Sequence, residues 1–196
     1  MKKLIMATGN AGKVREIAAI LAGEYDEVVS MKQEGLYVDV VEDADTFIGN
    51  ARKKALAISA VTEYDVVADD SGLCVDGLGG RPGVYSARYS ESGTDEDNNK
   101  KLVEEVTPLA EEDRSAYYAC AIVLARGGKE IFSCEGTCRG KIVTQPQGNG
   151  GFGYDPYFYL EEYGITFGQM DADLKNQISH RAVALRKLKN FIEEQK

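Results

Sequence analysis

Residues 66–73 read VVADDSGL, and this stretch decides how the rest of the chain can be arranged. Three apolar residues, typical of a buried strand, run directly into two adjacent aspartates and a Ser-Gly turn. We expect the strand over residues 66–68 to end at these aspartates. Because side chains alternate along a strand, Asp69 and Asp70 point to opposite faces, and each carboxylate has a different task.

Strands and helices alternate around this stretch, and a hairpin follows them. Apolar spacing predicts helices from Asn10, as an N-cap, to residue 21 and over residues 47–59, 96–106 and 179–194. β-Prone runs predict strands over residues 2–7, 28–31, 116–125, 130–143 and 152–160, with a Gly127-Gly128 hairpin turn. The predicted fold class is α/β, a mixed central β-sheet flanked by helices, in a single domain over residues 1–196.

The composition is that of an ordinary globular protein with an acidic balance. The net charge is −9, from 23 basic and 32 acidic residues, which argues against a nucleic-acid partner. No segment has the length of a membrane span, and the apolar run near the N-terminus is too short for a signal peptide. We therefore expect a cytoplasmic protein with no membrane partner.

Basic residues lie within apolar helix faces. Lys54 falls inside the apolar arc of the helix over residues 47–59, and Arg181 extends the apolar stripe of the last helix. A buried cation needs an anionic partner, so these residues fit either structural ion pairs or a ligand site. The sequence TGNAGK, residues 8–13, follows a strand and opens a helix, a general arrangement for holding phosphates, but Gly9 and Gly12 fit ordinary turn positions equally.

Carboxylates and cations together suggest phosphoryl chemistry on a nucleotide. Carboxylates repel a polyphosphate unless a divalent cation, for which we expect Mg²⁺, lies between them. A carboxylate is also a suitable base for activating water.

Five motifs in this order resemble the inosine triphosphate pyrophosphatase family, also called XTP/dITP diphosphatases. They are ATGNAGKVREI, TFIGNARKKA, VVADDSGLCVDGLGGRPGVYSARYS, GGFGYDPYF and LKNQISHRAVAL. The resemblance implies hydrolysis of 6-keto purine nucleoside triphosphates (ITP, dITP, XTP) to monophosphate and pyrophosphate. It also implies a homodimer, and a fold of two lobes with a central substrate cleft.

The resemblance assigns a role to each matching residue. It makes Asp70 the general base and, with Glu42, a metal ligand. The triphosphate is held by residues Thr8, Gly9, Asn10, Ala11, Gly12, Lys13 and Lys54. Ser71 contacts substrate. The purine base of the nucleotide packs against the loop of Phe152, Gly153, Tyr154 and Asp155, and its edge is recognised by Lys175, His180 and Arg181. Whether Asp69 is a further metal ligand or pairs outside the cleft stays open.

One position departs from the family pattern. Gly49 stands where the family usually has an acidic residue, which leaves Glu42, Asp69 and Asp70 as the carboxylates for a metal. Two alternatives to the predicted function stay open. One is a related pyrophosphatase for pyrimidine or methylated nucleotides. The other is a nucleotide sensor that no longer turns over, which Gly49 alone indicates.

Overall fold

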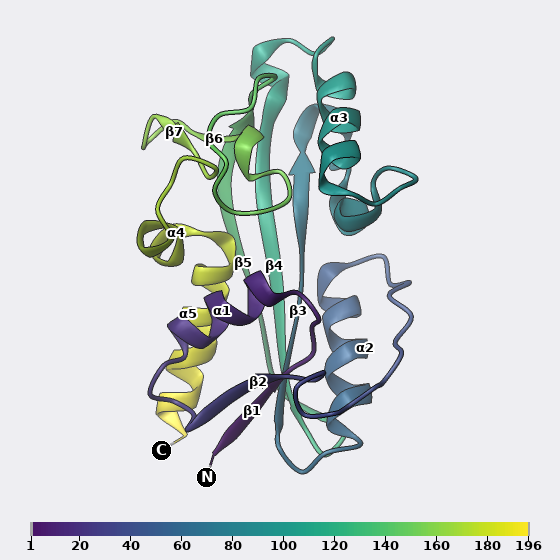
Figure 1. The fold of residues 1–196 in the computed structure, drawn as a ribbon, viewed down its shortest axis with the longest axis vertical. Coiled ribbons are helices and arrows are strands. Elements are labelled where there is room, and N and C mark those ends of the chain that lie inside the picture. Colours follow the sequence, from purple (N-terminus) through teal and green to yellow (C-terminus); the bar gives the residue numbers. More distant parts are fainter. Residues whose placement is uncertain (1, 196) are drawn as a thin grey trace. The chain divides into compact units, whose positions relative to one another are not determined.

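The computed structural model describes residues 2–195 and contains a mixed α/β fold (Figure 1). Its strands are β1 (Lys3–Met6), β2 (Glu27–Ser30), β3 (Asp65–Val75), β4 (Ser115–Arg126), β5 (Lys129–Ile142), β6 (Phe158–Leu160) and β7 (Ile165–Thr166). Its α-helices are α1 (Ala11–Ile20), α2 (Phe47–Ser59), α3 (Asp95–Val106), α4 (Ala172–Ile178) and α5 (His180–Glu194). Short 3₁₀ helices are η1 (Asp76–Leu78), η2 (Gly83–Arg88), η3 (Glu111–Arg114) and η4 (Asp155–Tyr157).

The strands form a seven-stranded sheet in the order β2-β1-β3-β4-β5-β6-β7. Strand β1 is parallel to both β2 and β3, whereas β6 is antiparallel to β5 and to β7. The turn between β4 and β5 is Gly127-Gly128, and both glycines have positive φ angles of 56° and 74°. A side chain is disfavoured in this conformation, which explains the two glycines. The predicted mixed α/β sheet is confirmed.

The described chain divides into two compact units. The first unit holds the described residues up to Asp70, Cys120–Gly136 and the described residues from Arg181 onward. The second unit holds Ser71–Ala119 and Thr137–His180. Strands β3, β4 and β5 contribute residues to both units. Among the described residues, the structure contains no helix that is long and apolar enough to cross a membrane.

The first unit packs helices against both faces of its strands. On one face, α1 and α5 cover Leu4, Val67 and Ile122. On the other face, α2 covers Ile5 and Val66. Consecutive residues of β1 and β3 therefore enter different cores, as the alternation of side chains along a strand requires.

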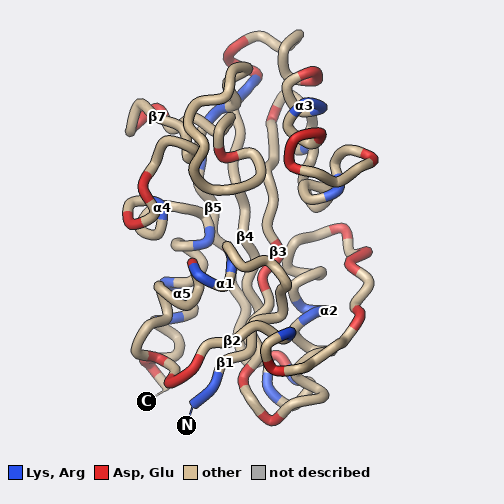
Figure 2. The backbone as a smooth tube through the Cα atoms, in the orientation of Figure 1, with Lys and Arg blue, Asp and Glu red and all other residues tan. Residues whose placement is uncertain are grey.

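Acidic residues recur along the segment that precedes α2, where Figure 2 shows several of them close together.

The second unit has its own apolar core. Helix α3 contributes Leu102 and Val106, which pack with Leu73 of β3 and with Phe158 of β6. The rings of Phe158 and Tyr118 meet edge to face with centroids 4.7 Å apart, a favourable arrangement for aromatic pairs.

Two predicted boundaries are wrong. Strand β3 does not end at the aspartates, because it continues through them to Val75. The run over residues 152–160 is a strand only from Phe158, since its first part is a glycine-bearing loop followed by η4. Helix α4 is an element that the sequence pattern did not indicate.

Candidate active site

The segment between β1 and α1 forms a tight turn that is fastened by its own side chains. Asn10 is the N-cap of α1, as predicted, and its Oδ1 accepts from Gly12 N at 2.9 Å and Lys13 N at 3.1 Å. Thr8 Oγ1 accepts from Asn10 N at 3.1 Å. Gly9, Asn10 and Ala11 are exposed, so this turn is accessible to a ligand.

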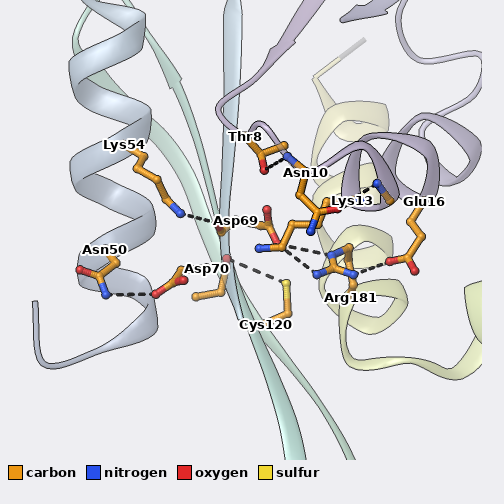
Figure 3. Close-up of polar contacts among 12 residues, drawn as sticks. Thr8, Asn10, Lys13, Glu16, Asn50, Lys54, Asp69, Asp70, Cys120 and Arg181 are labelled. Atoms are coloured by element: carbon orange, nitrogen blue, oxygen red, sulfur yellow. Dashed lines mark hydrogen bonds and ion pairs between the residues drawn. The ribbon is translucent and has the colours of Figure 1, made fainter. Parts of the chain in front are cut away.

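Asp69 and Asp70 leave β3 in different directions (Figure 3). Asp69 is 1% exposed, and its Oδ2 lies 3.0 Å from Lys13 Nζ and 3.3 Å from Arg181 Nη2. Its Oδ1 is buried and has no hydrogen-bond partner within residues 2–195. Asp70 is half-buried, and its Oδ2 accepts from Asn50 Nδ2 of α2 at 3.1 Å.

Lys54 and Arg181 have the inward positions and the anionic partners that the apolar faces predicted. Lys54 Nζ donates to Glu42 Oε2 and to the Asp69 carbonyl oxygen, each at 2.9 Å. Arg181 is 1% exposed and also pairs with Glu16 of α1 (Figure 3). The predicted cations Lys13, Lys54 and Arg181 therefore meet around the Asp69-Asp70 segment of β3.

The two aspartates have opposite pKa shifts. Burial raises the pKa of Asp70, and the opposing effects of Lys54, Asn50 and Lys13 are too small to cancel it. Burial alone would also raise the pKa of Asp69. However, the combined charges of Lys13, Arg181 and Lys54 lower it well below its usual range. At neutral pH Asp69 is a fixed anion, whereas Asp70 is the more basic carboxylate.

The residues predicted to contact the nucleotide base lie in the second unit, with the exception of Arg181. Phe152 is half-buried, and Lys175 Nζ lies 4.8 Å from the centroid of its ring. Lys175 Nζ also donates to Asp155 Oδ2 at 2.7 Å, and both side chains are almost fully buried. This group therefore combines an aromatic ring with a paired cation and anion.

Three further predicted residues of the second unit have defined surroundings. Tyr154 is buried and donates from its hydroxyl to the Ser86 carbonyl oxygen at 2.6 Å. His180 is buried, and its ring stacks on Tyr118 with centroids 4.7 Å apart. Ser71 follows Asp70 in β3 and is half-buried.

A model of the Ham1 family matches residues 4–191. The chain belongs to the Ham1 family. A Geobacillus kaustophilus protein named dITP/XTP pyrophosphatase is 49% identical over 195 residues, which cover 99% of this chain and 96% of the relative. A Clostridium tetani protein of the same name is 46% identical over 99% of this chain and 100% of its own length.

Solved structures agree with this membership. The Staphylococcus aureus Ham1 protein is 36% identical with a TM-score of 0.88, and the match covers 100% of both chains. A HAM1 protein from Coxiella burnetii is 33% identical with a TM-score of 0.89, covering 99% of this chain and 100% of the other. The family resemblance that the five motifs indicated is confirmed.

Sequence reasoning missed two residues of the first unit. Asn50 lies four positions before Lys54 in α2, and Glu16 lies three positions after Lys13 in α1. Residues at these spacings share a helix face, so the predicted lysines were the signal that could have found both.

Gly49 has a local structural reason. A Cβ at this position would lie 2.8 Å from Ala44 Cβ and 2.9 Å from Thr46 Oγ1, which is closer than real Cβ atoms approach. Thr46 is the N-cap of α2 and accepts from Gly49 N. The turn before α2 therefore has no room for a side chain at residue 49 in this conformation.

Proposed function

We propose that this protein hydrolyses dITP, ITP and XTP to the nucleoside monophosphate and pyrophosphate, and so removes deaminated purines from the nucleotide pool. The substrate class follows the name of the Geobacillus kaustophilus relative, dITP/XTP pyrophosphatase, which is 49% identical to this chain. The observation that supports this chemistry is a contrast between two adjacent residues of β3. Asp69 is a buried anion whose charge is compensated by three cations, whereas Asp70 is a carboxylate with a raised pKa.

Asp70 is the proposed general base. Its carboxylate takes a proton from water while the water oxygen forms a bond to the α-phosphorus. The bond between that phosphorus and the α–β bridging oxygen breaks, and its electron pair leaves with pyrophosphate. The Asn50 amide holds Asp70 Oδ2 at 3.1 Å and so limits the directions that the base can take. Lys54, Lys13 and the turn from Thr8 to Gly12 would bind the phosphate oxygens.

A divalent metal fits this part of the chain, and we propose Mg²⁺ held by Glu42 and Asp70. The charge of Glu42 raises the pKa of Asp70, which means that the two carboxylates are close enough to repel each other. Residues 2–195 hold no group of three or more potential metal-ligating side chains. Magnesium commonly takes one or two carboxylates and completes its shell with water and substrate phosphates, so two carboxylates suffice. When bound, the metal would neutralise charge on the phosphate oxygens.

The base-binding role falls mainly to residues of the second unit. Phe152 supplies a ring for stacking, and Gly153, Tyr154 and Asp155 shape the loop that carries it. A 6-keto oxygen accepts hydrogen bonds from cationic donors, whereas the adenine amino group would leave such donors unpaired. We propose Lys175, His180 and Arg181 as the residues responsible for this preference, and Ser71 as a substrate contact.

The remaining properties are proposals from the same resemblance. We propose a cytoplasmic homodimer with a small-molecule substrate and no nucleic-acid or membrane partner. The acidic balance of −9 supports the absence of a nucleic-acid partner. Light scattering after size-exclusion chromatography distinguishes a dimer from a monomer.

Hydrolysis in water enriched in ¹⁸O tests the proposed reaction. ITP, XTP, dITP, GTP, ATP and UTP are each supplied with Mg²⁺, and monophosphate, pyrophosphate and orthophosphate are measured separately. Attack at the α-phosphorus places the label in the monophosphate, whereas label in pyrophosphate would contradict it. Chelation of Mg²⁺ with EDTA is expected to stop turnover, and added Mg²⁺ to restore it.

The same substrate series separates the alternatives. Equal kcat/KM for ATP and ITP would refute the 6-keto preference, and faster turnover of UTP would favour a pyrimidine pyrophosphatase. Nucleotide binding with no product of any kind would identify a sensor.

A further inference from the structure

The loop that carries Phe152 is fastened to the first turns of helix α3. Asp95 Oδ2 accepts from Gly153 N at 2.8 Å, and Asn99 Nδ2 donates to the Gly153 carbonyl oxygen at 2.9 Å. Asp95 and Asn99 are four residues apart, so they lie on the same face of the helix. Two side chains of α3 thus hold both the N–H and the carbonyl group of one residue of the loop.

Gly153 is a position where the backbone needs such support. Its φ angle is +61°, in the left-handed region that residues with side chains rarely adopt. Without a side chain, Gly153 offers only its backbone groups for fixing the loop. Glycine also has the largest conformational freedom to lose, so an unsupported Gly153 would let the neighbouring Phe152 move.

The opposite end of the loop is fastened by Asp155. Its Oδ2 accepts from Phe152 N at 2.9 Å and from Lys175 Nζ at 2.7 Å. A Cβ at Gly151 would collide with this carboxylate, so the loop folds tightly around it. Phe152 is therefore held by Asp155 from within the loop and through Gly153 by α3.

Asn99 makes its bond to Gly153 at a local cost. Its Oδ1 is buried and has no hydrogen-bond partner among the described residues. A buried unpaired oxygen is unfavourable, and a helix by itself has no need for an asparagine at that position. The hydrogen bond to the Gly153 carbonyl oxygen is therefore the contact that explains an asparagine at this position.

We propose that Asp95 and Asn99 are positioning residues that hold the Phe152 loop in the conformation that binds the purine base. They act through Gly153 and do not touch the nucleotide. This inference rests on the proposed function, because it assigns the base to Phe152. It goes further by placing a determinant of base affinity in α3, a helix to which the motif resemblance gives no role.

Alanine and asparagine variants at residue 95, with a neighbouring control, test the proposal. Asp95→Ala removes the acceptor for Gly153 N–H, whereas Asp95→Asn keeps an amide oxygen that can still accept. Glu96→Ala removes a carboxylate from the same first turn, so it matches the change in helix-dipole interaction without reaching Gly153. Asn99→Asp keeps the shape of the side chain but sets a second acceptor against the Gly153 carbonyl.

Each variant is assayed with ITP and with ribose 5′-triphosphate, which lacks the base. We expect Asp95→Ala and Asn99→Asp to raise KM for ITP about tenfold, because the first removes a hydrogen bond to a carboxylate and the second sets a carboxylate against the Gly153 carbonyl oxygen. The kcat for ITP and the KM for ribose 5′-triphosphate are expected to stay within about twofold of wild type. Asp95→Asn should restore most of the affinity, and Glu96→Ala should behave as wild type.

Three results would overturn the proposal. The first is an equal loss with both substrates, which would show a general effect on folding. The second is the same KM change in Glu96→Ala as in Asp95→Ala, and the third is an unchanged KM for ITP in both loop-contact variants. If the wild-type protein does not hydrolyse ITP, the proposed function fails separately. Calorimetric binding of IMP to wild type and to Asp95→Ala then tests the positioning role alone.

Discussion

Replacing Asp69 by asparagine removes a buried negative charge while keeping the shape of the side chain. Arg181 is 1% exposed and keeps Glu16 as a partner, but its Nε and Nη2 lose a carboxylate that lies 3.4 and 3.3 Å away. Lys13, whose side chain is 17% exposed, can turn its ammonium group toward solvent. The uncompensated charge is therefore mainly that of Arg181.

Removing one member of a buried ion pair typically costs about 3–5 kcal/mol of the free energy of unfolding. We expect the lower end, about 3 kcal/mol, because Glu16 stays in place and Lys13 can be hydrated. A domain has about 5–15 kcal/mol in total, so this is a large share. With an m-value of about 2 kcal/mol/M, the midpoint of urea unfolding would fall by about 1.5 M.

Urea unfolding followed by circular dichroism measures this loss at pH 7, and Asp39→Asn is the matched control. Asp39 is exposed, so the same change of charge there should leave the midpoint nearly unaltered. The double variant Asp69→Asn/Arg181→Met should lose less than the sum of the single losses, because no unpaired buried charge remains. Additive losses, or an Asp69→Asn midpoint equal to that of the control, would refute the role of the network.

The pH dependence provides a second measurement on the same variant. The pKa of Asp69 is lower in the folded than in the unfolded protein, where it is about 4. Its contribution to stability is therefore complete above pH 4 and decreases as the pH falls below that value. The difference in stability between wild type and Asp69→Asn should shrink in the same range. A constant difference down to pH 2 would contradict the assigned pKa shift.

Three further predictions concern the proposed base, the inward lysine and the Phe152 loop. Asp70→Asn should lower kcat by about 10²–10⁴, the usual contribution of a general base, with nucleotide binding retained in calorimetry; near-normal turnover would exclude the role. Lys54→Met should raise KM for ITP at least about tenfold with the native fold retained in circular dichroism, and an unchanged KM would remove Lys54 from the phosphate site. Gly151→Ala should lower the melting temperature more than Gly153→Ala, because both positions have positive φ but only a Cβ at Gly151 meets the Asp155 carboxylate; equal shifts would show that backbone strain alone decides.

The sequence alone predicted the elements in which apolar residues recur at a regular spacing. Helix α2 spans Phe47–Ser59, as its spacing predicts, and the Gly127-Gly128 turn lies where the hairpin was expected. These features depend on local residue preferences, which a single sequence displays directly. The same spacing found Lys54 and Arg181, because a charged residue inside an apolar stripe interrupts a pattern that is otherwise regular.

Features that depend on tertiary contacts were less accessible. The aspartates gave the appearance of a strand end, yet β3 continues through them, since the buried carboxylate is compensated by cations from α1 and α5. Asp95 and Asn99 are also invisible to pattern reasoning. Polar residues are common in the first turns of an amphipathic helix. Only the folded structure, which brings Gly153 within hydrogen-bond distance, shows that these two also hold the Phe152 loop.

The adjacent aspartates show how alternation along a strand can separate two chemical tasks. Both belong to one strand and are one residue apart, but Asp69 meets Lys13 and Arg181, whereas Asp70 meets the Asn50 amide. Lys13 pairs with the Asp69 carboxylate, and its remaining influence on Asp70 is too small to cancel the rise in pKa that the burial of Asp70 causes. Lys54 acts on both aspartates: its ammonium group binds the Asp69 carbonyl oxygen and Glu42, and its charge lowers the pKa of Asp69 and of Asp70. The raised pKa of the proposed base is thus a consequence of its own burial, which Lys54, Asn50 and Lys13 oppose only in part.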